Sequence, residues 1–108
     1  MIYYDNSPID SVANGHCIID RVYALSFSEF SKTDWTRLLN IYSRLPGWQG
    51  ASQEGCACWC GTSKPVPCLF ASIEPSGLHV TGELGSDAWS EWHAAFLPFV
   101  EDLPHFLV

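Results

Sequence analysis

Three cysteines alternate along the segment GCACWCG at residues 55–61. Successive side chains of a β-strand point to opposite faces, so Cys56, Cys58 and Cys60 would share one face of a strand. A fourth cysteine, Cys68, follows across the connection GTSKPVP. Thiolates bind zinc and act as nucleophiles, which makes this segment the first place to look for chemistry.

The spacing of these cysteines argues against a metal site on one regular strand. Same-face positions are about 6.5 to 7 Å apart, whereas zinc holds its sulfur ligands at about 2.3 Å in a tetrahedron. We therefore predict small buried thiols, with no metal and no cofactor. Two alternatives stay open: a bent strand that gathers some of Cys56, Cys58, Cys60, Cys68 and His79 around a metal, and a Cys60–Cys68 redox pair.

No other group of residues in the sequence indicates catalysis. The four histidines, at positions 16, 79, 93 and 105, are scattered and lie in no recognisable motif. The chain also lacks a glycine-rich phosphate loop with its lysine. We predict that the protein is not an enzyme.

Length and charge narrow the function further. The 108 residues predict a single compact domain over 1–108, with 1–16 as an extended lead-in. Twelve acidic against five basic residues give a formal net charge of −7, which excludes nucleic acid and disfavours anionic membranes. Such a charge suits a basic protein partner, and it also serves plain solubility. With no spanning segment, no signal-peptide pattern and an odd number of cysteines, we expect a cytoplasmic protein.

The elements that must position these residues follow from periodicity. The β-branched and aromatic run at 17–27 predicts a strand. Ser31, with Asp34 three residues later, predicts a helix start, and the helix should end at Pro46 and Gly47. Three strands are expected at 56–60, 68–73 and 78–84, the last two joined by the turn EPSG, whose Gly77 is suited to positive φ.

A second helix should begin after the N-cap residue Ser86, and Pro98 should end or kink it. The tail LPHFLV would add an edge strand. We therefore predict an α+β fold, an antiparallel sheet of about four strands with two helices packed on one face.

Aromatic and acidic residues indicate a binding surface. Trp48 lies in a glycine-rich stretch without periodic partners, and Trp59 lies opposite the cysteines on its strand. Glu74 and Glu83 should face water on the hairpin. We predict Trp48, Trp59, Glu74 and Glu83 as partner-binding residues, since an aromatic anchor within a charged rim is a common interface. Alternatively, Trp48 fills the end of the core.

The segments LPGWQG, ASIEPSGLHVTGEL and WSEWHAAF, within residues 45–97, resemble small bacterial proteins that include toxin-immunity proteins. The resemblance implies an inhibitor that binds one cognate toxin and occludes its active site. Immunity proteins have unrelated folds, so no site residues carry over. The alternatives are a thiol- or metal-dependent protein that uses Cys56, Cys58, Cys60 and Cys68, and a structural adaptor subunit.

Overall fold

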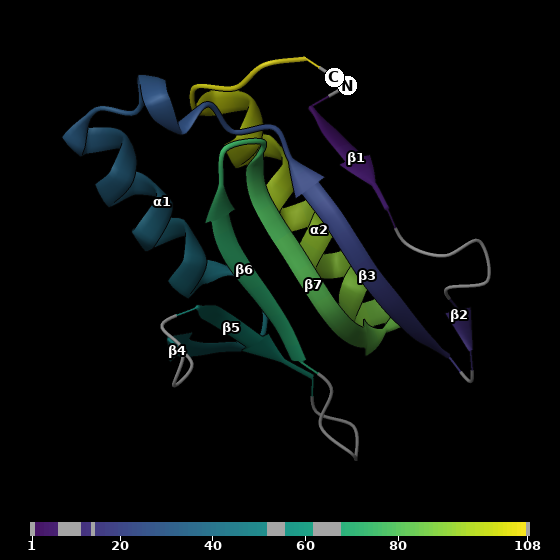
Figure 1. Cartoon of the computed structure of the whole chain (residues 1–108). Helices are drawn as coiled ribbons and strands as arrows, with labels where there is room; N and C mark the ends of the chain where they lie inside the picture. The colour runs from purple at the N-terminus through teal and green to yellow at the C-terminus, as the bar shows by residue number, and fades with distance from the viewer. Residues whose placement is uncertain (1, 7–11, 14, 52–55, 62–67, 108) are drawn as a thin grey trace.

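One antiparallel sheet and two long helices make up the structure, a computed structural model that describes residues 2–6, 12–13, 15–51, 56–61 and 68–107 (Figure 1). Statements below concern these residues. The strands are β1 Tyr3–Asp5, β2 Val12–Ala13, β3 His16–Tyr23, β4 Trp48–Ala51, β5 Ala57–Cys60, β6 Cys68–Glu74 and β7 Gly77–Gly85. The helices are the 3₁₀ turn η1 Phe27–Glu29, α1 Lys32–Arg44 and α2 Ser86–Asp102.

The sheet confirms the predicted α+β class but is wider than predicted. Six strands follow the order β1-β3-β7-β6-β5-β4, and β2 pairs with β3 as a short seventh strand. Strands β1 and β2 form in the segment expected to be a lead-in, and β4 forms where a loop was expected. The prediction of about four strands is therefore wrong, because β1 and β2 have only three and two residues, and β4 has a register irregularity between Trp48 and Gly50.

The centre of the sheet is the pairing of β3 with β7, in which His16 faces Gly85 and Tyr23 faces Leu78. Strand β3 ends at Tyr23, four residues before the end of the β-branched and aromatic run that predicted it. The 3₁₀ turn η1 begins at Phe27. Leu78, Val80 and Leu84 are buried, as their alternation predicts. Ile73 shares its face of β6 with the buried residues Leu69 and Ala71, yet it is 55% exposed beside the hairpin turn.

Helix α1 begins as its sequence predicts. The Ser31 hydroxyl accepts a hydrogen bond from the Asp34 amide at 3.2 Å, and the Asp34 carboxylate accepts one from the Ser31 amide at 2.9 Å. This reciprocal pair is a capping box, which satisfies backbone donors that the first turn leaves unbonded. The helix ends at Arg44, just before Pro46.

Helix α2 differs from its prediction at its N-cap and in the tail that follows it. Its N-cap is Gly85 rather than Ser86, and no side chain caps it. Of the two outcomes predicted for Pro98, an end or a kink, the end does not occur, because the helix continues to Asp102. The tail forms one isolated bridge, between Leu25 and His105, in place of the expected edge strand.

Both helices pack against the same face of the sheet, which we call the helix face. Trp59 of β5 defines this arrangement, since its ring centroid lies 5.2 Å from that of Tyr42 in α1 and 5.1 Å from that of Trp92 in α2. The Trp59 indole N–H also donates a hydrogen bond to the backbone oxygen of Tyr42 at 2.9 Å. The core therefore lies between the helices and this face, and it leaves the other face of the sheet without a helix.

The hairpin between β6 and β7 turns through Pro75 and Ser76, with Glu74 paired to Gly77. Gly77 has φ +133°, as its turn sequence predicts. A Cβ at this position would lie 2.1 Å from the backbone oxygen of Tyr23. Glycine is needed here both for its conformation and for the close approach of β3.

Neither helix of the described residues has the length and apolar character needed to cross a bilayer.

Candidate functional site

The hydrophobic core occupies only one face of the sheet. The face turned away from the helices, which we call the open face, is available for other contacts. Figure 1 shows α2 lying behind β3 and β7, so this face points toward the viewer. Register pairs place one row of side chains across four strands, since Asp20 faces Thr81, Thr81 faces Phe70, and Phe70 faces Cys58. With alternation along each strand, the open face includes Ile18, Asp20, Val22, Cys58, Cys60, Cys68, Phe70, Ser72, Glu74, His79, Thr81 and Glu83, of which Val22 and Cys58 are buried.

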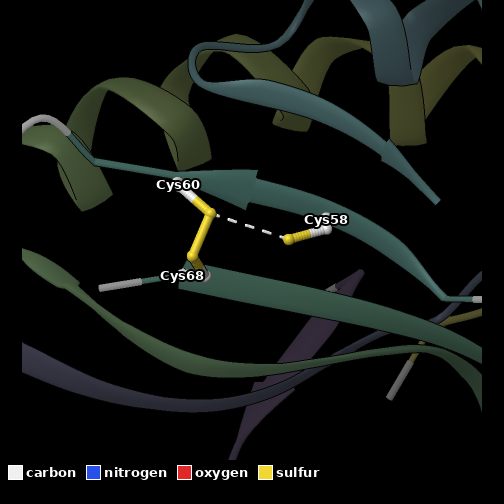
Figure 2. A group of neighbouring side chains, drawn as sticks. All are labelled: Cys58, Cys60 and Cys68. Carbon is white, nitrogen blue, oxygen red and sulfur yellow. Dashed lines mark hydrogen bonds between the residues drawn. A yellow bond between two sulfur atoms is a disulfide. The ribbon is translucent and has the colours of Figure 1, made fainter. Parts of the chain in front are cut away.

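Three sulfur atoms gather at one end of this row. Cys60 of β5 stands directly opposite Cys68 of β6, and the two form a disulfide. The Cys58 sulfur lies 3.7 Å from the Cys60 sulfur (Figure 2). All three sulfurs lie within 4.8 Å of one another. We call Cys58, Cys60 and Cys68 the sulfur cluster.

The disulfide corrects the prediction that the cysteines are all reduced. Cys60 and Cys68 are paired because the β5–β6 register places them face to face, which the alternative of a redox pair had anticipated. The spacing argument concerned three cysteines on one regular strand, and the sulfur cluster does not contradict it, because a second strand supplies Cys68 and Cys56 is not a member. The estimate for a neighbouring pair was too large, since the Cys58 and Cys60 sulfurs lie only 3.7 Å apart.

The chemical state of Cys58 follows from its position. Cys58 is buried, and this burial raises the pKa of its thiol because a thiolate is poorly solvated there. The thiolate is the form that attacks a disulfide. A raised pKa reduces the fraction of Cys58 present as thiolate and so disfavours its attack on the neighbouring Cys60–Cys68 disulfide.

The four predicted partner-binding residues do not form one surface. Trp48 faces Trp59 in the β4–β5 register, and both belong to the helix face. Trp59 has no exposed surface, so it cannot act as a partly exposed anchor, and Trp48 is half-buried against Tyr42. Glu74 and Glu83 are exposed on the open face. The expected arrangement of carboxylates around a tryptophan is therefore absent among these four residues.

Glu74 and Glu83 also lie far apart along the hairpin. Glu74 pairs with Gly77 at one end, and Glu83 lies near the other end of β7, opposite Ile18. Gly77 and Glu83 are six residue steps apart along an extended strand, which corresponds to about 20 Å. Between them lies a pair that the sequence did not single out, with His79 Nε2 2.6 Å from Asp20 Oδ1. Alternation along the strand places Asp20 on the same face as Ile18, so the face on which Asp20 lies could be predicted from the sequence. Its pairing with His79 could not, because it depends on the register between β3 and β7.

A second polar network, on the helix face, was also missed. Arg21 of β3 points inward, stacks over the rings of Tyr3 and Trp89, and bonds to Asp5 at 3.0 Å. Its Nη1 lies 3.1 Å from Nδ1 of His93. The only signal in the sequence was an arginine on the inward-facing side of a strand. The network fastens β1 and α2 to the edge of the sheet.

Comparison of the chain with models of known protein families, with curated proteins and with solved structures finds no match.

Proposed function

We propose that this protein is a small acidic binding protein that presents its open face to a protein with a basic surface. We propose further that it is a cytosolic immunity protein, which neutralises one cognate toxin by occluding its active site. The observation that carries the proposal is the open face itself. No helix of the described residues covers it, and it combines exposed carboxylates with exposed apolar side chains.

Charge distribution supports a basic partner. The four lysine and arginine residues within the described ranges are Arg21, Lys32, Arg37 and Arg44. Three of them belong to α1, and Arg21 points to the helix face. The open face carries Asp20, Glu74 and Glu83. Among the described residues the open face thus carries three carboxylates and no lysine or arginine, so it would attract a positively charged protein.

Apolar side chains on the same face supply the part of an interface that excludes water. Ile18 is 49% exposed and Phe70 is 39% exposed. Phe70 takes the anchoring role that had been assigned to Trp48 and Trp59, since aromatic side chains are enriched among residues that dominate binding energy. Carboxylates around an apolar centre reproduce the polar rim and apolar core of protein interfaces.

The test is the binding of the protein encoded by the adjacent gene, because immunity and toxin genes usually lie side by side. Association and dissociation rates would be measured at two salt concentrations. The double variant Glu74→Lys/Glu83→Lys should associate more slowly and lose much of the salt dependence, since rim charges steer encounter. Phe70→Ala should mainly accelerate dissociation.

The matched control is Glu29→Lys/Glu101→Lys, which makes the same change in net charge at two exposed positions in η1 and α2. It should retain more of the association rate than the open-face variant. Equal losses would show that net charge alone matters and that the open face is not the interface. Absence of binding by the wild-type protein, or binding without loss of toxin activity, would overturn the immunity role.

A further inference from the structure

We propose that Cys58, Cys60 and Cys68 bind one thiophilic d¹⁰ metal ion, Zn²⁺ or Cu⁺, once the Cys60–Cys68 disulfide is reduced. The sulfur cluster would then be a metal site that opens and closes with the redox state of its cysteines. This inference does not depend on the proposed immunity role.

The distances between the sulfurs support the site. Zinc–sulfur bonds of about 2.3 Å at tetrahedral angles place neighbouring sulfurs about 3.8 Å apart. The Cys58 and Cys60 sulfurs are already 3.7 Å apart. Cys68 is the third member of a group whose sulfurs all lie within 4.8 Å. One edge of the coordination polyhedron is therefore formed before any metal binds.

The backbone holds these three positions in place. Cys60 faces Cys68 and Cys58 faces Phe70 in the β5–β6 pairing. On the other side of β6, Gly82 has φ +140°, and a Cβ there would lie 2.1 Å from the backbone oxygen of Cys68. Strand β6 is thus held between β5 and β7 at this point. Figure 2 shows the Cys60–Cys68 disulfide joining the two strands, with Cys58 beside it. After cleavage of the disulfide, rotation of the Cys60 and Cys68 side chains would bring their sulfurs to ligand spacing.

The chemistry balances with a small thiol as the reductant. Two equivalents of the small thiol are oxidised to their own disulfide, and their two electrons and two protons convert the Cys60–Cys68 bond into two thiols. Binding of the ion then forms three metal–sulfur bonds and releases three protons, since each ligand coordinates as thiolate. Three soft ligands suit three-coordinate Cu⁺, and they leave a fourth position for water on Zn²⁺.

The redox conditions of the cellular compartment determine whether the disulfide form or the metal-binding form predominates. Small thiols keep cysteines reduced in the cytosol, whereas oxidising compartments preserve disulfides. The metal-binding form would therefore dominate in the first setting and the disulfide form in the second. The chain's net charge of −7 adds a general attraction for cations.

The experiment uses the full chain in two forms, as the disulfide and after reduction with a phosphine that is then removed without oxygen. Each form is titrated with Zn²⁺ and, in a separate arm, with Cu⁺, against a chromophoric chelator. The reduced form should bind one ion and release three protons per ion, and the disulfide form should bind none. The two arms determine which ion the site prefers. Co²⁺ should give thiolate-to-metal charge-transfer bands in the reduced form alone.

Cys58→Ser is the decisive variant, because it removes one ligand and keeps the disulfide pair. The affinity of its reduced form should fall by about 100-fold or more, since loss of even outer-shell partners costs 10–100-fold. Cys17→Ser is the matched control, a half-buried cysteine in the same sheet but outside the cluster. It should bind within about twofold of the wild type.

Three results would overturn the proposal. These are no stoichiometric ion in the reduced protein, equal binding by the disulfide form, and an equal effect of both serine variants. Circular dichroism of the reduced, metal-free protein checks the scaffold. If reduction alone unfolds the chain, the β5–β6 pairing cannot present the ligands, and the proposal is wrong.

Discussion

The phenolic oxygen of Tyr23 lies 2.7 Å from Nδ1 of His93, a nitrogen that Arg21 Nη1 also approaches. Arginine only donates hydrogen bonds, so Nδ1 is an acceptor and the Tyr23 hydroxyl donates to it as well. Burial raises the pKa of Tyr23, so this hydroxyl keeps its proton. His93 is therefore neutral, with its proton on Nε2.

This geometry predicts acid sensitivity. Burial, followed by the nearby positive charge of Arg21, lowers the pKa of His93 below its usual value, while Asp5 opposes the shift weakly. The unfolded chain then binds a proton at a higher pH than the folded chain does. The free energy of unfolding should be unaffected by His93 above about pH 6.5 and should fall as the pH drops below that value.

Thermal unfolding between pH 8 and pH 5 checks this expectation. His93→Asn offers a side-chain oxygen near the position of Nδ1 and does not titrate. It should show a flatter dependence of Tm on pH in this range than the wild type. An unchanged slope would mean that His93 is not the group responsible.

Gly77→Ala should destabilise the protein by more than 1 kcal/mol. The residue has φ +133°, and its added Cβ would meet the backbone oxygen of Tyr23. Gly15→Ala is the matched control, because Gly15 also has positive φ (+76°) but open space around it. Its cost should be limited to the conformational penalty of about 1 kcal/mol. Denaturant unfolding that gives equal costs would refute the close approach at Gly77.

Trp59→Phe should lower the free energy of unfolding by about 2 kcal/mol. The change removes buried volume and the 2.9 Å hydrogen bond that the Trp59 indole donates to the Tyr42 carbonyl, which keeps its bond from the Leu45 amide. Trp48→Phe removes the same atoms from a half-buried ring and should cost less. Chemical denaturation of both variants measures the difference. The reverse order would contradict the assignment of Trp59 as the residue that joins both helices to the sheet.

Removing the disulfide should lower the free energy of unfolding by about 2.5 kcal/mol. The link joins residues that are eight positions apart, and it restricts the conformational entropy of the unfolded chain. Cys60→Ala/Cys68→Ala measures this cost in the presence of a chelator. The reduced wild-type protein is the control, and it should lose a similar amount of stability. A double variant as stable as the oxidised protein would show that the link contributes nothing.

The sequence predicted the elements whose pattern extends over many residues. Helix α1 carries its own capping signal, and the β6–β7 hairpin carries both alternation and a turn motif. Strands β1 and β2 were missed because two or three residues cannot display a period, and β4 was missed because a register irregularity interrupts it between Trp48 and Gly50. Leu39 lies at helical spacing among the apolar residues of α1 but is 63% exposed, whereas Leu38, Ile41 and Tyr42 are buried.

The candidate site was harder to predict, because it depends on register. Alternation placed Glu74 and Glu83 correctly on exposed positions, but no local pattern shows that Trp48 pairs with Trp59 on the opposite face. The Cys60–Cys68 bond likewise requires β5 and β6 to pair without a shift across the intervening connection. A displacement by one residue would have turned every side chain of β5 to the other face.

The pairing of β3 with β7 also sets how the chain must fold. Its partners are separated by between 55 residues (Tyr23 with Leu78) and 69 residues (His16 with Gly85). The β6–β7 hairpin can form locally, whereas β3 must close a long loop, and such high contact order is associated with folding in milliseconds to seconds. Until β3 arrives, the central strand β7 has an unpaired edge. That interval is when the protein is most exposed to intermolecular strand pairing and aggregation.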